Sequence, residues 1–243
     1  MSDSPILTQW IRLGEDNDQP FDAYLALPPA GHGPGLLLLQ EIFGVNPHIR
    51  ALAEQYALAG YVVLAPDLFW RQATRIELGY EGAERDRAIA MMKAAAPAEL
   101  GSDVATTLQA LRARPEVAGR RAGAIGYCMG GRLAWAAAAA GQLDAAVAYY
   151  GGGIQDQLQL APAISCPIQL HYGDRDAAIP LEAVERVRAA LQPQIEAGSA
   201  EVHVYGEAGH GFNCWARSAY QPAASALALG RSLTFLAQRL FCP

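Results

Sequence analysis

The sequence predicts an α/β fold, with a mostly parallel central sheet covered by helices on both faces, as a single domain over residues 1–243. Apolar runs typical of strands alternate along the chain with stretches that have helical spacing. Residues 36–40 carry a continuous apolar run that is typical of a strand buried on both faces, and residues 61–65 form the next strand. Because crossovers between parallel strands are right-handed, each one delivers a helix onto the sheet.

Proline and glycine residues mark the ends of the expected helices and strands. Pro28 ends the first strand, Gly60 ends the first helix, Pro66 ends the third strand and Pro97 separates two helices. The expected strands are residues 24–27, 36–40, 61–65, 122–125, 145–150, 168–172 and 201–205. The expected helices are residues 49–58, 83–96, 98–114, 133–140, 181–191 and 223–240. The irregular residues 67–82 form a loop long enough to indicate a functional role.

Composition excludes several classes of protein. Apolar residues make up 52% of the chain and charged residues 17%, which is typical of a globular protein with a substantial core. The net charge of −6, without a basic cluster, disfavours nucleic acid and membrane surfaces as partners. No signal peptide is apparent and no apolar run reaches the ~20 residues of a membrane helix. We therefore expect a cytoplasmic protein with no obligate protein partner.

Four cysteines are spaced widely and irregularly, with no C-x-x-C pair. This spacing indicates neither a disulfide framework nor a zinc site. We expect no metal and no cofactor.

Residues 126–131, with the sequence GYCMGG, lie between an apolar run and an Ala-rich stretch. Glycines two before and two after Cys128 give the form of a nucleophile elbow, G-x-S-x-G, with sulfur in place of oxygen. An inert buried thiol is the alternative, since most free cysteines are of that kind. A cysteine at a strand-to-helix turn faces the helix N-terminus, however, and that end of a helix favours a thiolate.

A nucleophilic cysteine needs a base, and the base needs an acid to orient it. His210 lies in a glycine-flanked loop after the last strand, whereas Asp174 and Asp176 follow the strand before it. The spacing G-x-x-D favours Asp176, although a turn or helix-cap aspartate is the alternative. The carboxyl ends of parallel strands share one edge, so these residues can meet Cys128 there. The other histidines lack such a loop and are expected to be surface or packing residues: His32, His48, His171 and His203.

Together these motifs resemble the dienelactone hydrolases (carboxymethylenebutenolidases) of the α/β-hydrolase superfamily, over nearly the whole chain. The segments that carry the resemblance are QEIFGVN at 40–46, PDL at 66–68, GYCMGG at 126–131, YYG at 149–151 and AGH at 208–210. The resemblance implies an α/β-hydrolase fold. It also assigns the catalytic cysteine, aspartate and histidine to Cys128, Asp176 and His210, and the family's glutamate beside the thiol to Glu41.

Glu41 beside the thiol would disfavour the thiolate by like-charge repulsion and would accept the S–H hydrogen bond, unless it is an ordinary loop glutamate. The resemblance implies that substrate redirects this carboxylate toward an arginine and so releases the thiolate. Arg85 is the family arginine by position, and Arg87 is close enough to replace it. A solvated charge on a helix face is the alternative for either.

The chain departs from the family pattern just after the histidine. Close relatives of the namesake enzyme have a second substrate-binding arginine where this chain has Cys214, and Arg217 is the nearest substitute. A cation is expected because the substrate carries a carboxylate, which arginine binds bidentately. Tyr150 is a further candidate substrate contact, with a core aromatic as the alternative.

The expected reaction is hydrolysis of a carboxylate-bearing enol lactone such as dienelactone (4-carboxymethylenebut-2-en-4-olide) to maleylacetate. Thiolate attack would give a thioester that water then cleaves, and backbone N–H groups of Met129 and Ile42 would form the oxyanion hole. A broader carboxylesterase or thioesterase with the same triad is the alternative. A non-catalytic ligand-binding protein of the same fold is a second alternative.

Overall fold

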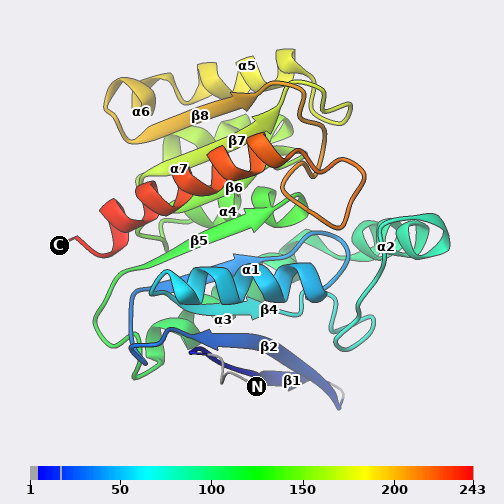
Figure 1. Ribbon diagram of the computed structural model, residues 1–243, viewed down its shortest axis with the longest axis vertical. Coiled ribbons are helices and arrows are strands. Elements are labelled where there is room, and N and C mark those ends of the chain that lie inside the picture. Colours follow the sequence, from blue (N-terminus) through cyan, green and yellow to red (C-terminus); the bar gives the residue numbers. More distant parts are fainter. Residues whose placement is uncertain (1–4, 17, 243) are drawn as a thin grey trace. The chain divides into compact units, whose positions relative to one another are not determined.

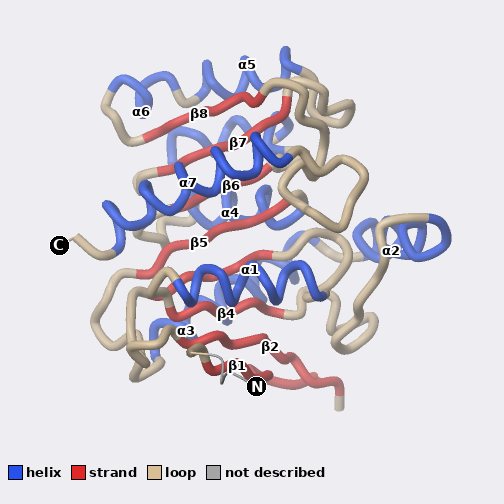
Figure 2. Tube along the Cα trace, in the orientation of Figure 1, coloured by secondary structure: helices blue, strands red, loops and turns tan. Residues whose placement is uncertain are grey.

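The computed structural model describes residues 5–16 and 18–242. Its chain divides into two compact units, residues 1–123 and 124–243. Each unit contains both strands and helices (Figures 1 and 2), and parallel strands are joined through helices, which confirms the predicted α/β class. The single-domain interpretation of residues 1–243 stays a prediction.

Four strands form the sheet of the first unit. The strands β1 (Leu7–Asp16) and β2 (Gln19–Leu27) form an antiparallel hairpin, and β2 also pairs antiparallel with β4 (Val62–Pro66). Strand β4 pairs parallel with β3 (Gly35–Leu39), and both are buried along their whole length, as the apolar run of β3 predicts for that strand. The sequence does not predict β1, because that strand is half exposed and has no continuous apolar run.

The helices of the first unit are α1 (Pro47–Leu58), α2 (Gly82–Ala94) and α3 (Pro97–Ala113). Helix α1 lies in front of the strands of its unit and α3 behind them (Figure 1). The Asn46 side chain caps α1 by accepting a hydrogen bond from the backbone N–H of Ile49. Helix α2 buries only two residues, Ala88 and Met91, so most of its surface faces solvent.

The irregular loop after β4 is held by two buried aspartates. Asp67 accepts hydrogen bonds from the backbone N–H groups of Phe69 and Arg75, and Arg75 has a φ of 51°. Asp103, on α3, accepts a hydrogen bond of 3.0 Å from the indole of Trp70. These hydrogen bonds therefore fix the predicted loop to the rest of the first unit.

The second unit contains four parallel strands in sequential order: β5 (Ala122–Tyr127), β6 (Ala146–Tyr149), β7 (Ile168–Gly173) and β8 (Ala200–Tyr205). Its α-helices are α4 (Met129–Ala139), α5 (Leu181–Ala190), α6 (Gln192–Glu196) and α7 (Pro222–Leu240). Two short 3₁₀ segments, Ile154–Asp156 and Leu158–Ala163, precede β7. Helix α7 lies in front of the strands and α4 behind them (Figure 1), so helices cover both faces as predicted.

Within the described residues, 5–16 and 18–242, none of the helices combines the length and apolar character that crossing a membrane requires.

Candidate active site

Cys128 lies in a strained turn between β5 and α4. Its φ of 55° and ψ of −113° fall in a region that residues other than glycine rarely adopt. The backbone N–H of Cys128 donates to the carbonyl of Tyr149 at 3.0 Å, and its carbonyl accepts the first helical hydrogen bond from Arg132 at 3.3 Å. The turn thus ends a strand and starts a helix at one residue, which is the geometry of a nucleophile elbow.

The glycines around Cys128 allow this turn to close. A Cβ atom on Gly126 would lie 2.0 Å from the carbonyl oxygen of Gly130, and one on Gly131 would lie 2.8 Å from the carbonyl oxygen of Tyr149. Real Cβ atoms essentially never come this close to a backbone oxygen, and the clash is most severe at Gly126. The glycine two residues before the cysteine is therefore a steric requirement of the turn.

Asp176 follows β7 and is almost fully buried, with 3% of its surface exposed. Its Oδ1 atom accepts hydrogen bonds from the backbone N–H groups of Ala178 at 2.8 Å and Ile179 at 3.1 Å, which fixes the carboxylate. The other oxygen, Oδ2, is left for His210, whose Nδ1 atom lies 2.8 Å away. Asp174 is exposed, so Asp176 is the aspartate that contacts the histidine.

His210 lies in the loop of residues 206–221 between β8 and α7 (Figure 2). The backbone N–H of Arg175 donates to the carbonyl of Ala208 at 2.9 Å, so the loop that carries the aspartate is tied to the one that carries the histidine. The Nε2 atom of His210 lies 3.2 Å from the Sγ atom of Cys128. The ends of three strands thus bring the predicted cysteine, histidine and aspartate into one hydrogen-bonded row.

The electrostatics of this row favour a protonated histidine. Burial alone would lower the pKa of His210, but the hydrogen bonds to Asp176 and to Cys128 outweigh it and raise the pKa to about 10. At neutral pH the ring is therefore an imidazolium between a carboxylate and the sulfur.

Two further predicted residues lie close to the histidine. Tyr150 has a φ of 36° and is fully buried, and its ring meets the His210 ring edge-on at a centroid distance of 5.2 Å. The guanidinium of Arg217 lies against Gly211, where a Cβ atom would come within 2.3 Å of its Nη1 atom. The Arg217 cation therefore lies beside the residue that follows the histidine. Cys214, at the position of the expected family arginine, is fully buried.

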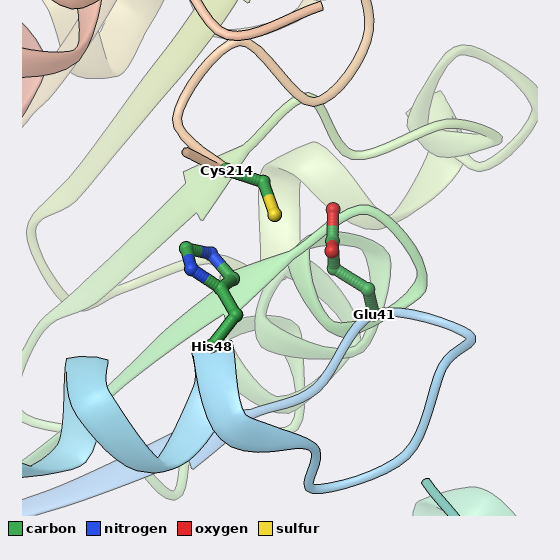
Figure 3. Close-up of side chains that lie close together, drawn as sticks. All are labelled: Glu41, His48 and Cys214. Atoms are coloured by element: carbon green, nitrogen blue, oxygen red, sulfur yellow. The ribbon is translucent and has the colours of Figure 1, made fainter. Parts of the chain in front are cut away.

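Other predicted site residues belong to the first unit. Glu41 follows β3 and has 1% of its surface exposed, and Ile42 has 8% exposed. Figure 3 shows Glu41 in the loop that leads away from β3 and His48 on the first turn of α1. Arg85 and Arg87 are both exposed on α2. The roles of Glu41, Ile42 and Arg85 stay predictions.

His171, expected to be a surface or packing residue, is a packing residue. It is fully buried and hydrogen-bonded through both ring nitrogens, to Tyr205 at 2.8 Å and to Gln169 at 2.9 Å. Gln169 lies on the same strand, β7, whereas Tyr205 comes from β8.

The comparison with protein families decides where this chain belongs. The model of the dienelactone hydrolase family matches residues 21–240. The chain belongs to the dienelactone hydrolase family. This confirms the resemblance carried by the sequence motifs.

Named relatives of this dienelactone hydrolase family member are similar to it over nearly their whole length. Carboxymethylenebutenolidase 1 of Cupriavidus pinatubonensis is 33% identical over 234 residues, covering 96% of this chain and 97% of the relative. The carboxymethylenebutenolidase of Pseudomonas putida is 33% identical over 235 residues, with the same coverage. A solved structure assigned to the dienelactone hydrolases, from Klebsiella pneumoniae, has a TM-score of 0.82 and 30% identity and covers 96% of this chain and 99% of its own.

Family membership confirms two predictions at once. The chain has the α/β-hydrolase fold of the dienelactone hydrolases. It is an enzyme, a hydrolase that acts on ester or lactone bonds.

Proposed function

We propose that this dienelactone hydrolase family member opens an enol lactone such as dienelactone to maleylacetate through a cysteine acyl-enzyme. The observation that carries the proposal is the row of Cys128, His210 and Asp176, with the cysteine in a strained turn and contacts of 3.2 Å and 2.8 Å. The substrate class is supported by the carboxymethylenebutenolidase name of the relatives at 33% identity.

In the first half of the proposed reaction, the Cys128 thiolate attacks the ring carbonyl and forms a carbon–sulfur bond. The resulting oxyanion accepts hydrogen bonds from the backbone N–H groups of Met129 and Ile42. Met129 is the first residue of α4, and N–H groups at such a position have no acceptor within their own helix. The ring carbon–oxygen bond then breaks, an enolate leaves, and a thioester on Cys128 remains.

In the second half, the His210 imidazolium first gives its proton to the leaving enolate, and the neutral ring then removes a proton from water. The resulting hydroxide attacks the thioester carbonyl. The carbon–sulfur bond breaks, the thiolate is regenerated beside the reprotonated ring, and the new carboxylic acid releases its proton to solvent. The enol formed from the leaving enolate tautomerises to the ketone without net uptake of a proton. Asp176 keeps the imidazole oriented and stabilises its charged form. The fixed carboxylate, held by two backbone N–H groups, suits this role.

A sulfur nucleophile restricts which esters and lactones can be good substrates. A thiolate is itself a good leaving group, so its adduct with a simple alkyl ester tends to collapse back to the starting materials. An enolate leaves readily, and the reaction then goes forward. Enol lactones and activated esters therefore suit a cysteine nucleophile better than alkyl esters.

Recognition of the substrate carboxylate is the proposed role of Arg217 and Arg85. Arg217 replaces the family arginine absent at Cys214, and the contact of its guanidinium with Gly211 supports a place beside the reacting groups. Glu41, buried after β3, is the proposed acceptor for the resting thiol, and Tyr150 is a further proposed contact. The same proposal includes a role in the breakdown of aromatic compounds, in the cytoplasm.

A panel of substrates tests this proposal. We expect kcat/KM for dienelactone to exceed that for neutral aryl esters of similar leaving-group acidity, because only the lactone offers a carboxylate to the arginines. Equal values would favour the broader carboxylesterase or thioesterase instead. No turnover of any ester or thioester would favour the non-catalytic alternative.

A further inference from the structure

A buried polar network surrounds His171 in the second unit. His171 is fully buried on β7, and its Nδ1 atom lies 2.8 Å from the hydroxyl of Tyr205 on β8. Its Nε2 atom lies 2.9 Å from Oε1 of Gln169 and 3.0 Å from Oγ of Ser232 on α7. Every polar atom of the ring therefore has a partner on another residue.

The network determines which nitrogen of His171 carries the proton. The amide nitrogen of Gln169 lies 2.8 Å from a carboxylate oxygen of Glu201, which can only accept a hydrogen bond. The amide must therefore present its nitrogen to Glu201 and its oxygen to His171. Because that oxygen is also only an acceptor, Nε2 of His171 carries the proton, and Nδ1 accepts a hydrogen bond from the Tyr205 hydroxyl.

The surroundings of His171 also keep the ring neutral. Burial lowers the pKa of His171 well below its ordinary value, and the neighbouring His203 and Arg231 lower it further. His203 is stacked on the His171 ring at a centroid distance of 5.4 Å, and its Nε2 atom donates a hydrogen bond of 2.9 Å to a carboxylate oxygen of Glu201. A neutral ring has a single N–H, in agreement with the pattern of donors and acceptors.

This network reaches the loop of the proposed catalytic histidine through aromatic rings. Ser232 lies 2.8 Å from the hydroxyl of Tyr149, so the network holds the hydroxyls of both Tyr149 and Tyr205. The rings of these tyrosines pack on Phe212 at centroid distances of 6.2 Å and 5.3 Å. Phe212 is fully buried, two residues after His210, and anchors that loop.

The backbone of His171 provides a second connection. Its carbonyl accepts a hydrogen bond of 2.7 Å from the backbone N–H of Tyr150, the residue with a φ of 36°. The Tyr150 ring contacts both Phe212, at 5.4 Å, and His210, at 5.2 Å. Side chain and backbone of His171 therefore act on the same loop.

We propose that His171, as the neutral Nε2–H tautomer, is a positioning residue that orients Tyr149 and Tyr205 against Phe212 and so holds His210 at the Cys128 thiol. His171 itself contacts neither substrate nor reacting atoms. The inference rests on the proposed function for the role of His210, but the geometry of the row can be measured without any substrate.

Removal of single hydroxyls tests the positioning role with little change in volume. We expect Tyr205→Phe and Ser232→Ala each to lower kcat on the order of 10-fold with KM unchanged, because a catalytic group that is displaced slows the chemical step. We also expect the His210 titration midpoint, followed by NMR, to fall below that of the wild type, since the contacts with Asp176 and Cys128 that raise the His210 pKa loosen.

Matched variants control for the loss of a hydrogen bond. Tyr24→Phe removes a hydroxyl that donates to Glu54 at 2.9 Å, and Ser199→Ala removes one that donates to the carbonyl of Gln194 at 3.1 Å. Both should retain the wild-type kcat and His210 titration. An unchanged His210 titration in Tyr205→Phe and Ser232→Ala would overturn the positioning role. A changed titration without lactone turnover in any variant would support it and reject the proposed function instead.

Nitrogen-15 NMR of the histidine rings tests the tautomer directly. The signal of His171, identified by its absence from the His171→Gln variant, should be that of an Nε2-protonated neutral ring and should not titrate between about pH 5 and about pH 8. An Nδ1-protonated or titrating ring would contradict the assigned network.

Discussion

The Nε2 atom of His210 lies 3.2 Å from the Sγ atom of Cys128 although the two residues are 82 positions apart in the chain. The opposite nitrogen of the same ring lies 2.8 Å from Asp176. The ring is thus held from both sides, and each partner comes from the end of a different parallel strand. The proposed mechanism depends on this relationship.

The charge of His210 should depend on its two partners. With its pKa raised to about 10, the ring stays protonated at neutral pH and loses its proton only as the pH rises through about 10. Asp176→Asn removes the hydrogen bond to the carboxylate and should lower the midpoint toward the ordinary value near 6.5. Histidine NMR over a pH series measures both midpoints. A midpoint that is the same in the wild type and in Asp176→Asn would refute this account of the charge.

The turn at Cys128 should not tolerate a side chain at Gly126. Gly126→Ala would force its Cβ to within 2.0 Å of a carbonyl oxygen, so the backbone must move, and we expect a loss of more than about 2 kcal/mol in the free energy of unfolding. Gly101→Ala is the control, because its Cβ meets nothing within 4 Å and helix α3 should gain up to about 1 kcal/mol. Urea unfolding compares the two. If both substitutions changed the free energy of unfolding only slightly, the turn would have space for a Cβ atom at position 126.

Arg217 and Arg85 should matter for the charged part of the substrate. Arg217→Ala and Arg85→Ala should raise KM for dienelactone about 10-fold or more, because each loses a charge-assisted hydrogen bond, and should leave neutral aryl esters nearly unaffected. Arg87→Ala, on the same exposed helix, is the matched control for Arg85. If Arg87→Ala had the larger effect, the family arginine would be Arg87. Equal losses on charged and neutral substrates would argue against carboxylate recognition by either residue.

Asp67 should make stability depend on pH. Burial raises its pKa from 3.8 to about 6, against the hydrogen bonds from Arg75 and Phe69. The folded protein therefore binds this proton more tightly than the unfolded chain, and the stability that protonation contributes is lost as the pH rises through about 6. Relative to Asp67→Asn, the wild type should lose up to about 3 kcal/mol between about pH 4 and about pH 7 in urea unfolding. A difference that does not vary with pH would exclude this behaviour.

Local signals in the sequence were sufficient for much of the fold and for the row of Cys128, Asp176 and His210. Continuous apolar runs mark β3 and β4 because those strands are buried on both faces. The elbow is visible because Gly126 is a local steric requirement. Asp176 and His210 follow strand ends, and parallel strands bring their ends together at one edge.

Other features depend on contacts between distant segments, which a single sequence does not reveal. Strand β1 is stabilised by pairing with β2 rather than by burial of an apolar run, so its pattern is weak. The partners of His171 come from β7, β8 and α7, and no spacing predicts them. The contact of Arg217 with Gly211 likewise depends on how the loop after His210 folds back.

The covalent role of Cys128 is the central claim, and hydrolysis of dienelactone by the Cys128→Ala variant tests it most directly. Circular dichroism should show an unchanged fold, while kcat/KM should fall by at least about 10³-fold, because no other residue of the row can form the thioester. A correctly folded Cys128→Ala variant that still hydrolyses dienelactone at the wild-type rate would contradict the acyl-enzyme mechanism.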